Sequence, residues 1–356
     1  MRYQKAYQGF HPFTPQYIYQ QLSRYVIGQE EAKRAIAIAT YRHYQANEVK
    51  KRQSASGGQA ESIKKSNILM IGPTGSGKTH IARTLAKTLD APIAVVNATE
   101  YTEAGYYGKD VDLMLTELLI ASKGSVEQAE RGVIFIDEID KIARRFYTGG
   151  SGEGERDIRG EGVQQALLKF LDGGKFRVPS TPAANYQMQD YVEVDSSGIL
   201  FICAGTFTEL ATKISKAVIG FESSAKDSDR LSHLISIRRN LEKYGMLQEF
   251  LGRIAVVARL NELTEPELVT ILKDPPDSIV HEYQALFRIG GADLMFTDGA
   301  LKLIAHEAKK LKLGARSLRA IFENILSDLL FNLPNLRGKQ VRIDKRYVKK
   351  RIEQAR

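Results

Sequence analysis

The sequence predicts an α/β protein in which a parallel sheet, covered by helices on both faces, is followed by a small and mostly helical domain. Its 356 residues exceed the usual size of a single small domain. Apolar runs of strand length alternate with helical patterns up to about residue 260, and this alternation is typical of parallel sheets. Beyond that point helical spacing continues while the strand signal fades. We therefore expect two domains.

The first segment of the chain precedes the sheet. Apolar residues recur at helical spacing over residues 30–45, which predicts a helix. The polar, small-residue run at 53–62 predicts a surface loop. We expect residues 1–60 to form an entry segment of helix and flexible loop, residues 61–260 the large domain, and residues 261–356 the small helical domain.

The large domain is expected to alternate strands and helices. Strands are predicted at 67–72, 91–98, 131–140 and 197–207, and helices at 79–89, 111–123 and 162–172. The glycine-rich, charged run at 144–162 predicts a mobile segment. In the small domain, helices are predicted at 262–272, 278–289, 298–311 and 315–331, followed by a short strand at 339–344.

Composition narrows the class of protein. The net charge of +9 invites a nucleic-acid hypothesis, but the basic residues are spread along the chain, which makes nucleic-acid binding an unlikely main role. No apolar run is long enough to span a bilayer, and the N-terminus lacks the apolar centre of a secretory signal. The single cysteine, Cys203, excludes a four-cysteine zinc site. We expect a cytoplasmic protein without a membrane partner.

The sequence GPTGSGKT follows the first predicted strand and opens a helix, as a phosphate-binding loop must. Its glycines let backbone N–H groups surround phosphate oxygens at the positive end of the helix. Lys78 is expected to reach the β- and γ-phosphates of ATP, and Thr79 to ligate Mg²⁺. The expected nucleotide-binding residues here are Gly72, Pro73, Thr74, Gly75, Ser76, Gly77, Lys78, Thr79 and His80.

An acidic pair ends the strand VIFID at the edge where phosphates bind in such a sheet. Asp137 suits a Mg²⁺ held through water, and Glu138 suits the polarisation of an attacking water, so the sequence predicts ATP hydrolysis. Arg253, after a glycine, and Arg316, at a helix start, are candidates to stabilise charge on the γ-phosphate. By spacing alone, either arginine could equally be an ordinary surface residue.

The chain resembles ClpX-type AAA+ unfoldases from about residue 15 to residue 344. The strings that carry this resemblance are YVIGQEEAKRA, TEAGYYGKDV, VIFIDEIDKIARR, GEGVQQALLKFLDG, EFLGRIAVVARLNELT and GARSLRAI. The phosphate loop is shared with many families, whereas GEGVQQALLK together with GYYG and GAR is far more specific. HslU is also similar, but it carries a long insertion that this chain lacks.

The resemblance implies roles for individual residues. Val26 and Ile27 match positions that contact adenine, Arg253 matches the arginine finger that enters a neighbour's site, and Arg316 matches the sensor 2 arginine. Thr206 lies near the sensor 1 position, although the asparagine common there in AAA+ proteins is absent. The implied assembly is a homohexamer.

Two loops of the family have counterparts in this sequence. Tyr106 and Tyr107 in GYYG match the pore loop that grips a translocating polypeptide, with Tyr107 in place of the usual valine. Ile219, Gly220 and Phe221 match the loop that docks on a ClpP-like peptidase, although these three residues could also form an ordinary buried turn. The implied substrates are unfolded or tagged proteins.

Two departures from the family limit what the resemblance implies. ClpX proteins usually begin with a zinc-binding domain, which we expect this chain to lack. The stretch at 178–195 has no Arg-Lys-His loop, so preference for a particular tag is not implied. A protease-independent remodeller of protein complexes remains an alternative function, and an AAA+ nucleic-acid motor a less favoured one.

Overall fold

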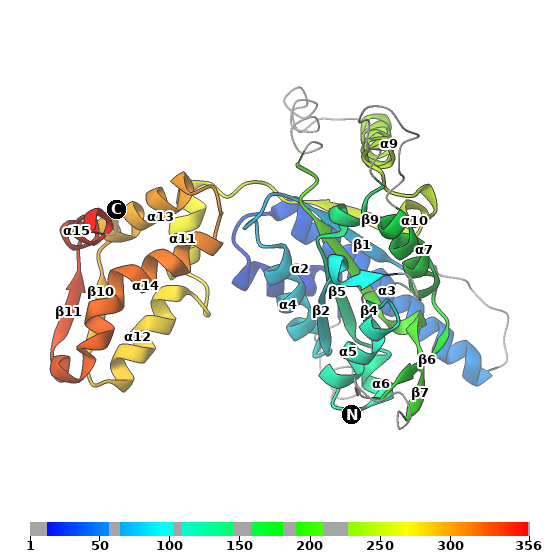
Figure 1. Cartoon of the computed structure of the whole chain (residues 1–356), viewed down its shortest axis with the longest axis horizontal. Helices are drawn as coiled ribbons and strands as arrows, with labels where there is room; N and C mark the ends of the chain where they lie inside the picture. The colour runs from blue at the N-terminus through cyan, green and yellow to red at the C-terminus, as the bar shows by residue number, and fades with distance from the viewer. Residues whose placement is uncertain are drawn as a thin grey trace. The chain divides into compact units, whose positions relative to one another are not determined.

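The chain folds into two compact units. The computed structural model describes residues 13–56, 65–102, 109–144, 158–180, 190–208 and 227–354 (Figure 1). The large unit comprises residues 1–19, 31–73 and 82–259, and the small unit comprises residues 20–30, 74–81 and 260–356.

A five-stranded parallel sheet forms the centre of the described part of the large unit. Its strands are β1 (Asn67–Ile71), β2 (Ile93–Asn97), β5 (Val133–Asp137), β8 (Leu200–Gly205) and β9 (Ile254–Arg259), in the order β2-β5-β8-β1-β9. Every residue of β1 and β8 is buried, as expected for strands covered on both faces. The predicted parallel sheet with helices on both faces is therefore confirmed. Because the strands are parallel, all their carboxyl ends lie at one edge and all their amino ends at the other; we call these the carboxyl edge and the amino edge.

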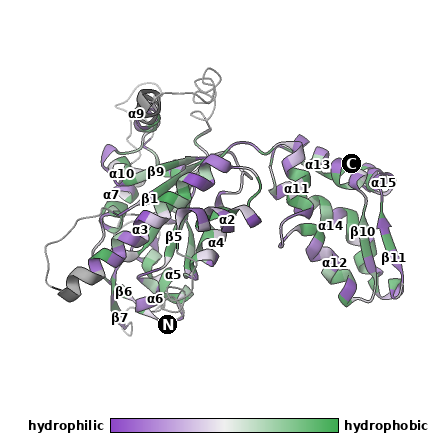
Figure 2. Ribbon diagram, turned by 180° about the vertical axis from the view of Figure 1, so that it is seen from behind, coloured by the Kyte–Doolittle hydropathy of each residue, from purple (hydrophilic) through white to green (hydrophobic). Residues whose placement is uncertain are grey.

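Helices lie on both sides of this sheet (Figure 1). Those before residue 260 are α2 (Pro15–Tyr25), α3 (Glu30–Ser56), α4 (Lys78–Leu89), α5 (Leu113–Ala121), α6 (Val126–Ala129), α7 (Ile158–Asp172), α9 (Asp227–Tyr244) and α10 (Gln248–Gly252). In Figure 2 the central strands are mainly hydrophobic, whereas the helices carry hydrophobic and hydrophilic positions in alternation. Among the described helices, none has the length and apolar character to cross a membrane.

Short elements connect the main ones. Two-residue strands β3 (Tyr101–Thr102) and β4 (Lys109–Asp110) pair in parallel, and β6 (Lys175–Pro179) pairs antiparallel with β7 (Tyr191–Asp195). Single 3₁₀ turns are η1 (Ala98–Glu100), η2 (Ile139–Ile142) and η4 (Ser196–Gly198). The sequence did not predict these pairs, because strands of two to five half-exposed residues carry too short an alternation.

The small unit is mostly helical, as predicted. It contains α11 (Glu265–Lys273), α12 (Ile279–Ile289), α13 (Asp298–Lys310), α14 (Arg316–Phe331), η5 (Leu333–Leu336) and α15 (Lys345–Gln354), with β10 (Asp293–Phe296) paired in parallel with β11 (Gln340–Ile343). Thr264 begins α11 with a full capping box, in which its side chain accepts from the Glu267 N–H and the Glu267 carboxylate accepts from the Thr264 N–H. The core of this unit lies between α11, α12, α13 and α14.

Local structure differs from the prediction in helix α3, which is longer than expected, and in strands β9 and β10, which were not expected. Helix α3 continues to Ser56, so the loop expected at 53–62 does not begin at residue 53. Residues 46–52 include Ala, Glu, Lys and Arg, which are strong helix formers, and they carry the helix past its amphipathic part. Strand β10 was not expected, since its four residues follow two glycines and stand between helices. Residues 57–64 and most of the run expected to be mobile, 145–157, lie outside the described residues.

Candidate nucleotide site

The phosphate-binding loop starts at the carboxyl edge of the sheet. Strand β1 ends at Ile71, and the N–H of Gly72 donates to the carbonyl of Gly205, the last residue of neighbouring β8, at 3.2 Å. Gly75 and Gly77 have φ angles of +75° and +100°, which residues with a Cβ rarely adopt. Helix α4 then begins at Lys78. Glycines are therefore needed at these two turns, as the GPTGSGKT motif predicts.

The loop has the features of an anion cradle. A Cβ added at Gly77 would meet nothing within 4 Å, so open space faces the backbone at this point. Ser76 is only 3% exposed, yet its Oγ has no hydrogen-bond partner among the described residues. A buried hydroxyl without a partner is costly, and a phosphate oxygen would supply one. The loop therefore fits a nucleotide phosphate.

Within the small unit, the loop contacts the residues that precede α14. The N–H of Ala315 donates to the carbonyl of Gly75 at 3.1 Å. A Cβ at Gly314 would lie 2.6 Å from the same carbonyl oxygen, so the two backbones approach too closely for a side chain. Arg316, the first residue of α14, is exposed directly beyond this contact. The structure thus brings the sensor 2 candidate beside the phosphate loop.

The predicted adenine contacts lie on a segment of the same unit. Val26 is 4% exposed and Ile27 is half-buried, just after α2. The His80 ring nitrogen Nε2 lies 3.2 Å from the Tyr25 carbonyl, which connects this segment to the start of α4. Three candidates from distant parts of the sequence, Val26, Ile27 and His80, are thereby grouped.

The acidic pair lies at the carboxyl edge of β5. Glu138 has a φ angle of +58°, and its N–H donates to Asp137 Oδ1 at 2.9 Å. Asn97, the last residue of neighbouring β2, donates from Nδ2 to Glu138 Oε2 at 3.2 Å. Asn97 and Asp137 are register partners in the sheet. Asn97 was not predicted to be a site residue. Its position at the end of a predicted strand, like that of the acidic pair, was the feature of the sequence that could have indicated it.

Thr206 is held by a second acidic residue that was also missed. Its N–H donates to Asp140 Oδ1 at 3.2 Å, and its Oγ1 donates to Asp140 Oδ2 at 2.9 Å. Asp140 is only 2% exposed, so its carboxylate is committed to this contact. These hydrogen bonds connect the end of β8 to the turn after β5. The sensor 1 candidate Thr206 is therefore held next to the end of the strand that Glu138 follows.

Arg253 lies at the opposite edge of the sheet. It caps α10 and immediately precedes β9, whose first residue pairs in register with Asn67 at the amino end of β1. Its guanidinium forms a two-point ion pair with Asp172, with Nε 2.8 Å from Oδ1 and Nη2 2.9 Å from Oδ2. A strand rises about 3.3 Å per residue, so roughly 17 Å of sheet separates this edge from Gly72. Arg253 is thus not grouped with Gly72, Glu138 and Thr206 of the same unit.

Five candidates lie outside the described residues. These are Tyr106 and Tyr107 of the expected pore loop, and Ile219, Gly220 and Phe221 of the expected docking loop. The residues that flank the first loop are described. Tyr101 Oη donates to Glu117 Oε1 at 2.8 Å, and Lys109 Nζ lies 3.2 Å from the same oxygen. With the β3–β4 pairing, these contacts hold residues 101 and 109 close together.

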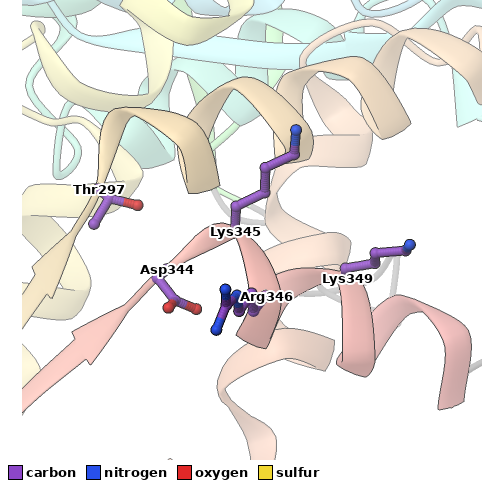
Figure 3. A pocket seen from close by; sticks show the side chains of 5 residues that line it. All are labelled: Thr297, Asp344, Lys345, Arg346 and Lys349. Carbon is purple, nitrogen blue, oxygen red and sulfur yellow. The ribbon is translucent and has the colours of Figure 1, made fainter.

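A hollow of about 460 Å³ lies in the small unit, away from these candidates in the chain. Its lining residues are Thr297, Asp344, Lys345, Arg346 and Lys349, at the starts of α13 and α15. Figure 3 shows the Lys345 and Lys349 side chains extending away from Asp344, while Arg346 lies beside it. None of the predicted nucleotide-site residues lines this hollow, so it is not part of the candidate site.

Two protein-family models match the chain. Residues 63–257 match the AAA domain (Cdc48 subfamily), and residues 263–347 match the C-terminal, D2-small domain of ClpB protein. Their order along the chain agrees with a sheet-containing part followed by a mostly helical part.

Curated relatives match over nearly the whole chain. The ATP-dependent Clp protease ATP-binding subunit ClpX 2 of Wolinella succinogenes is 44% identical over 321 residues, covering 90% of this chain and 78% of the relative. The corresponding ClpX subunit of Porphyromonas gingivalis is 41% identical over 92% of this chain and 79% of the relative. That of Treponema denticola is 40% identical over 94% and 81%. The phosphate loop, the acidic strand end and these matches agree, and the chain belongs to the ClpX family of AAA+ ATPases.

Proposed function

We propose that the protein is an ATP-driven unfoldase that works as a homohexamer and passes unfolded or tagged proteins to a ClpP-like peptidase. The relatives named above are ATP-binding subunits of ATP-dependent Clp proteases, which supports this assignment. In this proposal residues 61–260 and 261–356 are the large and small domains of each protomer.

The phosphate loop binds the nucleotide in this proposal. Its backbone N–H groups and the Ser76 hydroxyl donate to phosphate oxygens, and Lys78 neutralises the β- and γ-phosphates. Thr79 and Asp137 would hold Mg²⁺ together with the phosphates, because the ion usually binds through one or two protein oxygens and the substrate phosphates. That ion supplies positive charge against the phosphate oxygens.

Glu138 accepts the proton of the attacking water in this mechanism. The carboxylate is exposed at the end of β5, and the hydrogen bond from Asn97 fixes one of its oxygens while the other is left to orient water. Thr206, held by Asp140, stands at the end of the adjacent strand β8 and would report the state of the phosphate. Arg316 would contact the phosphates from the start of α14.

One observation carries the requirement for a ring. Arg253 stands at the amino edge of the sheet, whereas the phosphate loop and Glu138 stand at the carboxyl edge. A guanidinium on a side chain of about 7 Å cannot cross roughly 17 Å of sheet to its own nucleotide. Arg253 therefore acts on the site of a neighbouring protomer, where it stabilises charge that develops on the γ-phosphate. ATP hydrolysis then depends on assembly.

Mixed rings test this requirement. Arg253→Ala removes the finger but leaves the protomer's own Glu138, while Glu138→Gln inactivates the protomer's own site but leaves its finger. Each variant alone should hydrolyse ATP at least about 100-fold more slowly than the wild type. Mixed in equal amounts and reassembled, they should recover about a quarter of the wild-type rate, because random mixing places a working finger beside a working site at that frequency.

The outcome that contradicts the proposal is a mixture no more active than its components although both assemble. A Glu138→Gln protein that hydrolyses ATP normally would likewise remove Glu138 from the mechanism.

The coupling of hydrolysis to unfolding is tested with a tagged fluorescent protein and a ClpP-like peptidase. ATP-dependent loss of fluorescence is expected, and Tyr106→Ala should hydrolyse ATP without unfolding the substrate. Phe221→Ala should keep ATPase and unfolding activity but lose degradation. Unfolding that proceeds without any stimulation of the peptidase would instead indicate a remodeller, and ATPase activity stimulated only by DNA would indicate a nucleic-acid motor.

A further inference from the structure

The Arg253 guanidinium is held on two sides by its own chain. On one side, Nε and Nη2 bind the two carboxylate oxygens of Asp172 at 2.8 and 2.9 Å. On another, Nη1 donates to the carbonyl of Glu249 in the preceding helix α10 at 2.8 Å. These contacts fix both the position and the plane of a side chain that would otherwise sample many rotamers.

The contacts leave a defined part of the guanidinium available. A guanidinium carries five N–H groups in one plane, and the described hydrogen bonds of Arg253 use three of them. One N–H remains on each terminal nitrogen. Asp172 occupies the side formed by Nε and Nη2, so one N–H on each of Nη1 and Nη2 is left to donate to a phosphate.

Asp172 is attached to the same frame as Arg253. It is the last residue of α7, and the side chain of Asn67 joins this helix end to the arginine backbone. Asn67 Nδ2 donates to the Leu171 carbonyl at 3.1 Å and to the Arg253 carbonyl at 3.0 Å. Asn67 is 1% exposed and begins β1, so the link is part of the sheet itself.

A partly buried lysine reinforces the end of α7. Lys65 Nζ donates to the Phe170 carbonyl at 3.0 Å and to the Ser196 carbonyl at 2.8 Å, and lies 4.5 Å from the centre of the Phe201 ring. Its charge is favourable at a helix carboxyl end, where backbone carbonyls lack partners. Burial nevertheless lowers the pKa of Lys65 to about 7. The helix end that carries Asp172 is therefore fixed from two directions.

We propose that Asp172 is a positioning residue that orients Arg253 toward the γ-phosphate in the neighbouring protomer. The inference rests on the proposed trans role of Arg253. Asp172 takes the Nε side of the guanidinium, and the phosphate takes its free end. Asp172 itself touches no nucleotide, so it acts only through Arg253.

Substitution of Asp172 should slow turnover without weakening ATP binding. Asp172→Asn keeps the size of the side chain but removes its charge and replaces one of the two accepting oxygens with an NH2 group, which cannot accept from the guanidinium. We expect kcat to fall by about tenfold while KM for ATP stays within about twofold, because a misaligned finger affects the transition state rather than the bound substrate. Glu193→Gln is the matched control, since it breaks another exposed ion pair of the large unit, 2.7 Å long, with Lys175. It should leave both constants unchanged.

Mixed rings separate positioning from a general structural role. Donor protomers carrying Glu138→Gln are mixed with Arg253→Ala protomers, and the same experiment is repeated with donors carrying both Glu138→Gln and Asp172→Asn. The donor's own site is inactive in both cases, so any difference reflects the finger that it offers to its neighbour. The second mixture should recover about tenfold less activity than the first, with equal hexamer content by analytical ultracentrifugation and equal thermal stability. Asp172→Glu, which restores the carboxylate, should recover part of the loss and serves as the donor if Asp172→Asn does not fold.

The two proposals fail in different ways. If Arg253→Ala hydrolyses ATP at the wild-type rate, the trans role of Arg253 is wrong. If Arg253→Ala is inactive but the two mixtures recover equally, the finger role stands and the positioning role of Asp172 is overturned. A rise in turnover in Asp172→Asn would also overturn it, since that result would mean that Asp172 restrains the finger.

Discussion

The two edges of the central sheet use polar residues in different ways. At the carboxyl edge, side chains at neighbouring strand ends contact one another: Asn97 binds the exposed Glu138, and the half-buried Thr206 binds the buried Asp140. At the amino edge, side chains bind backbone carbonyls, as the buried Asn67 and the partly buried Lys65 do. The first arrangement leaves donors and acceptors for a ligand. The second fixes helix ends and loops to the sheet.

Because of this difference, substitutions at the carboxyl edge should mainly affect catalysis, whereas substitutions at the amino edge should mainly affect stability. A group exposed at the carboxyl edge contributes little to folding, because water replaces its partners when it is removed. A polar group buried at the amino edge is costly to leave without a partner. Arg253 is the exception, because it stands at the amino edge and is proposed to act on a ligand, which belongs to another protomer.

The largest effect is expected at the end of β5. Glu138→Gln should lower ATP turnover by at least about 100-fold, because the amide cannot accept a proton from water. Nucleotide binding, measured with a fluorescent ATP analogue, and the midpoint of urea unfolding should be unchanged, since the side chain is exposed. A large loss of stability in Glu138→Gln would contradict the expectation that residues at the carboxyl edge serve catalysis and contribute little to folding.

A smaller effect is expected at Asn97. Asn97→Asp places a second carboxylate beside Glu138, which removes the donated hydrogen bond and adds repulsion between like charges. Turnover should fall by about tenfold, less than in Glu138→Gln. Asn97→Ala removes the hydrogen bond without adding charge and is the matched variant; it should fall between Asn97→Asp and the wild type. Steady-state ATPase rates at saturating ATP decide the order, and equal rates in all three proteins would contradict the role of Asn97.

The remaining prediction concerns the stability of the amino edge, with turnover unaffected, and depends on pH. His43 on α3 is fully buried, with Nε2 3.0 Å from the Gly198 carbonyl just before β8. Burial lowers the pKa of His43 to about 4, and the positive charge of Lys65 adds to the shift. The unfolded chain therefore binds a proton more readily than the folded protein, so the free energy of unfolding should decrease as the pH falls from 6.5 to 4. The decrease assigned to His43 is at most about 3 kcal/mol.

Urea unfolding followed by circular dichroism measures this dependence. Wild type and His43→Gln are compared between pH 6.5 and pH 4, and the difference between their slopes isolates His43 from the carboxylates that titrate in both. Lys65 does not contribute in this window, because its effect on stability lies above pH 7, between its folded and unfolded pKa values. Parallel curves for the two proteins would show that His43 is not held in its neutral form.

The sequence predicted the parts of the site that depend on local patterns. The glycines of the phosphate loop and the acidic pair at the end of β5 belong to short motifs that come directly after an apolar strand. Such a motif can be recognised from about ten consecutive residues. Asn97, Asp140 and Asp172 were not predicted, because each acts through a residue that is distant in sequence and near only in the folded sheet. The partner of Arg253 lies 81 positions away, and no periodicity indicates it.

The same reasoning explains the errors in the fold. Four strands of the sheet, β1, β2, β5 and β8, lie in apolar runs and were recognised. Strand β9 is only partly buried and was missed, and the four-residue strand β10 has too short a pattern. Helix α3 continued past its amphipathic part on residues whose intrinsic helix preference is high although they have no apolar face. The end of α3 is therefore explained by the intrinsic helix propensity of its residues, which the apolar pattern of the sequence does not reveal.

The position of Arg253 at the amino edge has a consequence for dilute protein. In the proposed mechanism, a separate protomer binds ATP with its own phosphate loop and Arg316, but no Arg253 from a neighbour reaches its γ-phosphate. Hydrolysis per protomer should therefore rise steeply with protein concentration and reach a plateau once rings have closed. Protomers that have not assembled would bind ATP without hydrolysing it. ATP would therefore be consumed only by assembled rings.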